Sequence, residues 1–93
     1  MTVYYKQGVI GDLQPIARKG LGRVAELYGF HGEFIYVTSL RDGNHMAGSL
    51  HYDGLAFDIK QGRRPIEQIK DTLGPGWDVV EGPTYYHCEY DPK

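Results

Sequence analysis

The chain has 93 residues, of which 41% are hydrophobic and 24% charged, and its formal net charge at pH 7 is -2. This length and composition are typical of one folded domain over residues 1–93 and exclude the disordered class, which is poorer in apolar residues. The chain lacks the basic excess with which proteins neutralise nucleic-acid phosphates. We therefore expect no nucleic-acid partner.

The cysteine content and the N-terminal segment bear on the compartment. Cys88 is the single cysteine, which rules out an intramolecular disulfide and suits a reducing cytoplasm. The first residues lack the charged and apolar regions of a signal peptide, and no segment approaches the ~18 apolar residues of a membrane span. We expect a cytoplasmic protein with no membrane contact, and the sequence does not indicate an oligomeric state.

The first predicted element is a helix that begins near Asp12 and ends near Gly29. Its apolar residues recur at steps of three and four and so share one face: Leu13, Ile16, Ala17, Leu21, Val24, Ala25 and Tyr28. We expect Asp12 to cap the start and Gly29 to end the helix. Gly20 costs ~1 kcal/mol relative to alanine in a helix interior, which indicates a close packing contact there.

Two strand segments follow this helix. Residues 33–40, EFIYVTSL, are rich in β-branched and aromatic residues and predict a strand. Residues 50–60, LHYDGLAFDIK, predict either a strand pair or one strand bent at Asp53 and Gly54, a dipeptide that favours tight turns.

A second helix and two closing strands complete the chain. Pro65 suits the first turn of this helix and Gly74 its end. Residues 77–82 and 85–90 predict two strands joined by a short turn. The order helix, strand, strand, helix, strand, strand predicts an α+β domain with a small antiparallel sheet and two helices.

Side-chain alternation in the predicted strands brings chemistry-bearing residues together. In residues 55–60 the apolar side chains take the core face, which leaves Asp58 on the other face. A sharp turn at Gly54 would return His51 to the side of Asp58. In residues 85–90 the same alternation separates Cys88 from a second face that carries three polar side chains: Tyr85, His87 and Glu89.

Two imidazoles and one carboxylate, from His51, His87 and Asp58, are a usual ligand set for catalytic zinc, with water in the open fourth position. Zinc acidifies this water toward neutral pH, so that it can attack a carbonyl. The same pattern also fits a surface pair or capping contact of His51 with Asp58, and an ordinary half-buried strand histidine at position 87. The residues alone leave these alternatives open.

The segment SLHYDGLAFD, residues 49–58, resembles the S-x-H-x-x-G-x-A-x-D signature of the zinc D-alanyl-D-alanine carboxypeptidase and L-alanyl-D-glutamate endopeptidase family. All five fixed positions match: Ser49, His51, Gly54, Ala56 and Asp58. The ending HCEYDPK and the approach VTSLRDGNHMAGSLH also look like those of short phage-type members. The resemblance covers about residues 12–93 and implies the hedgehog/DD-peptidase fold.

The resemblance also implies roles for individual residues. Its zinc ligands would be His51, Asp58 and His87. Arg41 would hold a substrate carboxylate or a polarised carbonyl, which suits the fork of guanidinium donors, although a solvated loop charge fits equally well. His45 would line the cleft or stabilise its loop, and Ser49 is placed with the substrate-binding residues.

The chain departs from the family at the general base. The family has an acid three residues before its last histidine ligand, whereas this chain has Thr84 there, followed by Tyr85. Loss of a positioned base costs on the order of 10²- to 10⁴-fold in rate. Glu81 is the provisional substitute base, and it also fits a turn-edge charge or a remnant of a lost site. Tyr85 would hydrogen-bond substrate or an oxyanion, or be a half-exposed strand tyrosine.

Three functions are compatible with this pattern. The first is a small zinc peptidase or amidase, encoded by a phage or prophage, that acts on D-amino-acid-containing peptides of bacterial cell walls. The second is a catalytically silent binding protein that sequesters a small ligand or host protein in the same cleft, and the replaced acid favours it. The third is an assembly module of a virion. The missing base leaves open whether the chain is an enzyme.

Overall fold

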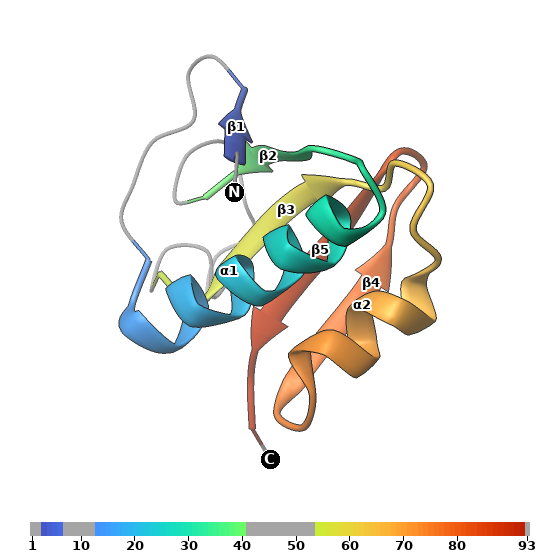
Figure 1. The fold of residues 1–93 in the computed structure, drawn as a ribbon. Helices are drawn as coiled ribbons and strands as arrows, with labels where there is room; N and C mark the ends of the chain where they lie inside the picture. Colours follow the sequence, from blue (N-terminus) through green and yellow to red (C-terminus); the bar gives the residue numbers. More distant parts are fainter. Residues whose placement is uncertain (1–2, 7–12, 41–53, 93) are drawn as a thin grey trace.

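A five-stranded sheet carries both helices on one of its faces (Figure 1). The computed structural model describes residues 3–6, 13–40 and 54–92. The elements follow in the order β1 (Val3–Tyr5), α1 (Pro15–Phe30), β2 (Ile35–Ser39), β3 (Ala56–Lys60), α2 (Ile66–Leu73), β4 (Trp77–Glu81) and β5 (Tyr85–Tyr90). The predicted α+β class with two helices is therefore confirmed.

The strands are arranged in the order β1-β2-β3-β5-β4. Three of the four pairings are antiparallel, as predicted, but β1 runs parallel to β2, with Val3 opposite Ile35. The sheet is therefore mixed, and the prediction of a purely antiparallel sheet is wrong. The prediction omitted β1 because a strand of three residues is too short to show an alternating pattern.

The helix ends differ slightly from the prediction. The N-cap of α1 is Gln14, followed by Pro15, whose fixed φ suits the first helical position; Asp12, the predicted cap, lies outside the described residues. The helix continues past Gly29 to Phe30, and Gly32 takes the left-handed conformation instead. For α2 the predicted end is confirmed, because Gly74 is its C-cap with φ 82°.

The core lies between the helices and the sheet. The predicted apolar face of α1 is buried except at Ile16, which is 40% exposed. From the sheet side, alternate residues of the central strands are fully buried against it: Ile35, Val37, Phe57, Ile59 and Cys88. The hydroxyl of Tyr28 donates to the carbonyl oxygens of Lys60 and Gln61 at 3.0 and 2.9 Å, which ties α1 to the end of β3.

Gly20 of α1 lies directly against the Trp77 side chain of β4. A Cβ atom at this position would lie 2.5 Å from Cζ2 of Trp77. The Trp77 ring in turn packs on Phe57, with ring centroids 5.6 Å apart. The close contact predicted at Gly20 is therefore confirmed. Neither described helix is long and apolar enough to cross a membrane.

Gly20→Ala is expected to lower the free energy of unfolding by about 1–2 kcal/mol, because overpacking against Trp77 outweighs the gain in helix propensity. Gly22→Ala is the matched control in the same helix, since no heavy atom lies within 4 Å of a Cβ there. This control should stabilise the protein by about 0.5–1 kcal/mol. Urea denaturation measures both values, and equal effects would contradict the packing.

Candidate metal centre

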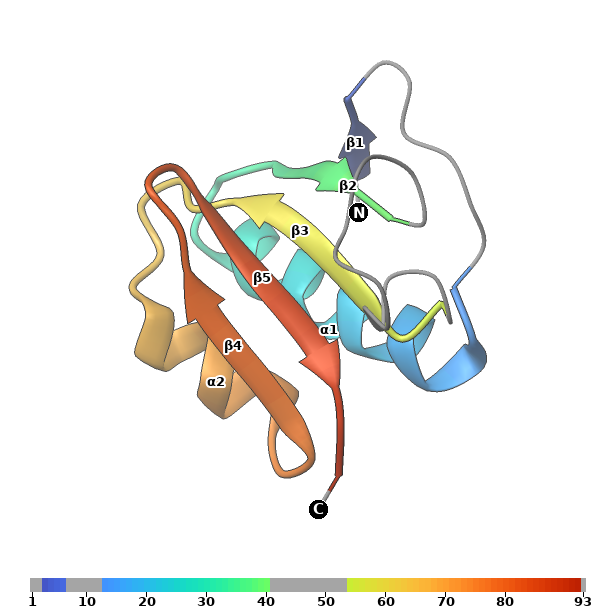
Figure 2. The same cartoon turned by 180° about the vertical axis from the view of Figure 1, so that it is seen from behind.

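Asp58 on β3 and His87 on β5 meet across the ladder of these two strands. Figure 2 views the sheet from the side away from the helices. The two residues are direct partners in the antiparallel ladder of β3 and β5. Their neighbours Phe57 and Cys88 are fully buried on the opposite side, as the pleat requires. We call the side that carries Asp58 and His87 the His87 face. The prediction that both residues avoid the core face is confirmed.

The side chains of this pair are in direct contact. The Nδ1 atom of His87 lies 2.8 Å from Oδ1 of Asp58. A register shift between Val37 and Ser39 sets Ser39 opposite Asp58 on the other neighbouring strand, β2. Such bulges turn side chains out of the regular alternation and are frequent beside functional sites.

Glu89 is the second carboxylate beside His87. Its Oε1 atom lies 2.6 Å from Nε2 of His87, so that both ring nitrogens face a carboxylate. The hydrogen bond to Asp58, with that to Glu89, outweighs the opposing effect of burial and raises the pKa of His87 above its usual range. Sequence alternation placed Glu89 on the correct face but assigned it no role, because contact with His87 depends on side-chain conformation.

The donor atoms of Asp58 and His87 fit a transition-metal ion such as zinc, which binds imidazole nitrogen and carboxylate oxygen. Two ligand atoms at tetrahedral zinc lie about 3.4 Å apart, so the observed contact would have to open by about half an ångström. A carboxylate on the remaining ring nitrogen is the usual outer partner of a metal-bound histidine, and Glu89 occupies this position. Four of the other predicted site residues lie outside the described residues: Arg41, His45, Ser49 and His51.

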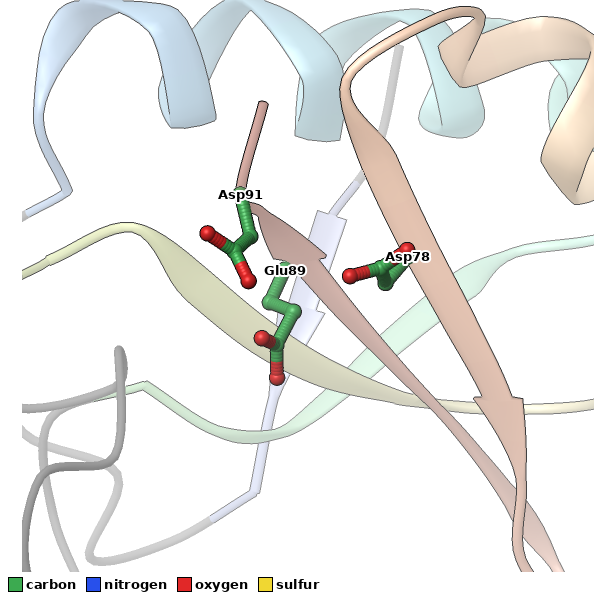
Figure 3. A group of neighbouring side chains, drawn as sticks. All are labelled: Asp78, Glu89 and Asp91. Atoms are coloured by element: carbon green, nitrogen blue, oxygen red, sulfur yellow. The ribbon is translucent and has the colours of Figure 1, made fainter. Parts of the chain in front are cut away.

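A group of three carboxylates adjoins this pair (Figure 3). Asp78 on β4, Glu89 on β5 and Asp91 just after β5 each offer an oxygen atom within 4.8 Å of the other two. This acidic trio could hold a metal ion, and its all-oxygen donor set suits Ca²⁺ or Mg²⁺ better than zinc. Sequence reasoning missed it because the contact depends on the register of β4 with β5.

Glu81, the provisional base, is not brought to this site. It is the last residue of β4 and lies opposite Tyr86, while Val80 lies opposite His87. The pleat therefore directs Glu81 to the other side of the sheet from His87. Burial, together with the negative charge of Glu81, raises the pKa of Tyr86, which is consistent with this placement. Because β4 continues through Glu81, the alternation of the strand, and not the following turn, sets the direction of the Glu81 side chain.

Tyr85 lies on the His87 face, at the start of β5, as predicted. It is 38% exposed, and its ring lies over Gly82, where a Cβ atom would collide with it. The side chain of Gln61 donates to the carbonyl oxygens of Gly82 and Tyr85 and so braces the turn between β4 and β5. Tyr85 is therefore held in place beside the candidate metal centre.

No protein-family model matches the chain, and no curated protein matches it at significant similarity. The resemblance to the zinc peptidase family thus rests on the sequence motifs alone.

The thiol of Cys88 should be nearly inert in the native protein. It is fully buried on the helix side of β5, and burial, with a smaller contribution from Asp58, raises its pKa. We expect its reaction with Ellman's reagent to be about 100-fold or more slower in native than in denatured protein, because reaction requires a thiolate exposed by unfolding. Rapid labelling without denaturant would show that β5 has a different register.

Proposed function

We propose that the chain is a small zinc-dependent peptidase or amidase with a hedgehog/DD-peptidase-like fold, similar to the D-alanyl-D-alanine carboxypeptidases that act on cell-wall peptides. The observation that carries the proposal is the contact of Asp58 with His87. These two residues are 29 positions apart in the chain, and the family resemblance implies that both are zinc ligands. Their polar atoms lie side by side on one face.

In this proposal the chain supplies three ligands, Asp58 and His87 together with His51 of the signature. In the metal-free protein the Nδ1 proton of His87 bonds to Asp58; Glu89, which accepts the Nε2 proton, would hold the ring in place while loss of the Nδ1 proton frees that lone pair for the metal. When bound, zinc would polarise the scissile carbonyl and acidify a water molecule. Arg41 would orient the substrate.

In a hydrolytic reaction at this site, proton transfer from water is the step for which no described carboxylate is positioned as the base. Thr84 and Tyr85 supply no carboxylate, and Glu81 belongs to the other side of the sheet. Glu89 is on the correct side, but its contact is with Nε2 of His87. We therefore expect any turnover to be slow compared with that of an enzyme with a positioned base, by on the order of 10²- to 10⁴-fold.

The position of Glu81 favours a second candidate function, a catalytically silent protein that binds a small ligand or host factor in the same cleft. Such a protein needs the cleft, with or without zinc, but no base. For both candidates we propose the cytoplasm as the compartment, since the single thiol suits reducing conditions.

Metal content tests the ligand set. Protein purified without chelator is expected to hold about one zinc ion per chain by elemental mass spectrometry, and His87→Ala and Asp58→Ala should lose it, since three protein ligands are typical of such sites. Glu89→Gln should keep a zinc site with about 10- to 100-fold weaker affinity, because outer partners tune ligands without binding the metal.

Asp78→Asn is the matched control for these variants. It removes a carboxylate of the acidic trio without touching the Asp58–His87 pair, and zinc affinity should stay within about twofold of wild type if the ligand set is correct. Loss of zinc in Asp78→Asn, with retention in His87→Ala, would place the metal at the acidic trio.

Product analysis separates the two candidate functions. Zinc-loaded protein incubated with muropeptides that end in D-alanyl-D-alanine should release D-alanine, detected by mass spectrometry. His87→Ala should abolish release, whereas Glu81→Gln should leave it unchanged because Glu81 faces away from the pair. Tight binding of a peptide that is recovered uncleaved would support the sequestering protein instead.

A further inference from the structure

A cavity of about 400 Å³ opens on the His87 face next to the candidate metal centre. Six residues line it: Lys6, Tyr36, Thr38, Lys60, Thr84 and Tyr85. Every one of these side chains carries a hydrogen-bond donor, and none is a carboxylate. Its size lies within the range of small-molecule sites, which run from roughly 300 to 1,000 Å³.

The lining carries two positive charges in a chain whose formal net charge is -2. Neither Lys6 nor Lys60 forms an ion pair with any residue that the structure describes. The Lys60 ammonium group lies 4.9 Å from the centre of the Tyr36 ring, a cation–π contact that holds it at the cavity wall. Ammonium groups can only donate, so their complement is an anion.

Two other cavities show how distinctive this lining is. The one beside Phe30 includes Glu26 and Glu33, and the one along β4 includes Asp78 and Glu89. These carboxylates oppose anion binding in both cavities, although Lys70 also lines the second. Among these three cavities, only the one at Lys60 combines positive charge with the absence of carboxylates.

The sheet register fixes the distance between this cavity and the metal centre. Lys60 follows Asp58 by two residues on β3, Tyr85 precedes His87 by two residues on β5, and Lys60 and Tyr85 are themselves direct partners. The Lys60–Tyr85 pair therefore lies about 7 Å along the strands from the Asp58–His87 pair, and both pairs point to the same side of the sheet. A small ligand can reach both at once.

We propose that the cavity at Lys6, Lys60 and Tyr85 is a subsite for the anionic group, a carboxylate or a phosphate, of the small ligand that the protein binds. The further statement that the other end of this ligand lies at Asp58 and His87 rests on the function proposed for that pair. Anion binding itself needs no metal. The two lysines supply the charge, and the hydroxyl groups of the lining residues supply further donors.

The test uses metal-free protein, in chelator, so that its outcome is independent of whether the chain binds zinc. Titrations of ¹⁵N-labelled protein with N-acetyl-D-alanine, N-acetyl-D-alaninamide and inorganic phosphate are followed by NMR. We expect at least one of the two anions to shift the backbone amides of Tyr36, Lys60 and Tyr85. The neutral amide should bind at least about tenfold more weakly than N-acetyl-D-alanine if the carboxylate is the recognised group.

The titrations with the two anions distinguish a carboxylate ligand from a phosphorylated one. Binding of N-acetyl-D-alanine supports a peptide carboxylate, and binding of phosphate alone supports a phosphorylated ligand. No shift at these amides with either anion, or equal binding of the acid and its neutral amide without any effect of phosphate, would overturn the proposal.

Variants test whether the residues that line the cavity cause the anion binding. Lys60→Gln should weaken binding of the effective anion by about three- to tenfold, as expected for loss of one partly solvated charge partner. Lys60→Arg should restore it. Lys19→Gln, which removes an exposed lysine from α1 and so changes the net charge equally, should leave it unchanged. Equal weakening in Lys19→Gln and Lys60→Gln would show that only net charge matters and would overturn the proposal.

Discussion

Antiparallel pairing of β3 with β5 is the constraint on which the site and the core both depend. Because side chains alternate along a strand, one register places Asp58 against His87 and buries Phe57 and Cys88 on the other side. A shift by one residue would drive a carboxylate into the core and expose an aromatic ring. Full burial of a residue such as Phe57 or Ile59 is worth about 1.5–3 kcal/mol each, so the core holds the polar pair in place.

The same pleat explains which parts of the fold follow from sequence. Alternation correctly predicted the faces of Asp58, His87 and Cys88, and Gly74 correctly marked the end of α2. A strand of three residues is too short to show an alternating pattern, so neither β1 nor its parallel pairing with β2 was predicted. The ends of α1 differ from the prediction because Pro15 starts the helix after the N-cap Gln14, and because Gly32, not Gly29, takes the left-handed conformation.

The structure brings two of the predicted site residues together, for a physical reason. A strand pattern determines which side of the sheet a residue occupies, and this was enough for Asp58 and His87. Glu81 was the provisional base, but β4 continues through that residue and the pleat turns its side chain away. The role of Glu89 arises from a side-chain contact within β5, and the acidic trio arises from contacts between β4 and the end of β5; periodicity predicts neither.

Anomalous diffraction at the zinc edge, from crystals grown with zinc, tests the central claim most directly. The account predicts one strong anomalous peak within bonding distance of Oδ1 of Asp58 and Nδ1 of His87, at about 2.0–2.2 Å, with Glu89 still on Nε2. A peak among Asp78, Glu89 and Asp91 that leaves the Asp58–His87 contact intact would contradict it, because the signature would then mark a pair of residues that binds no metal.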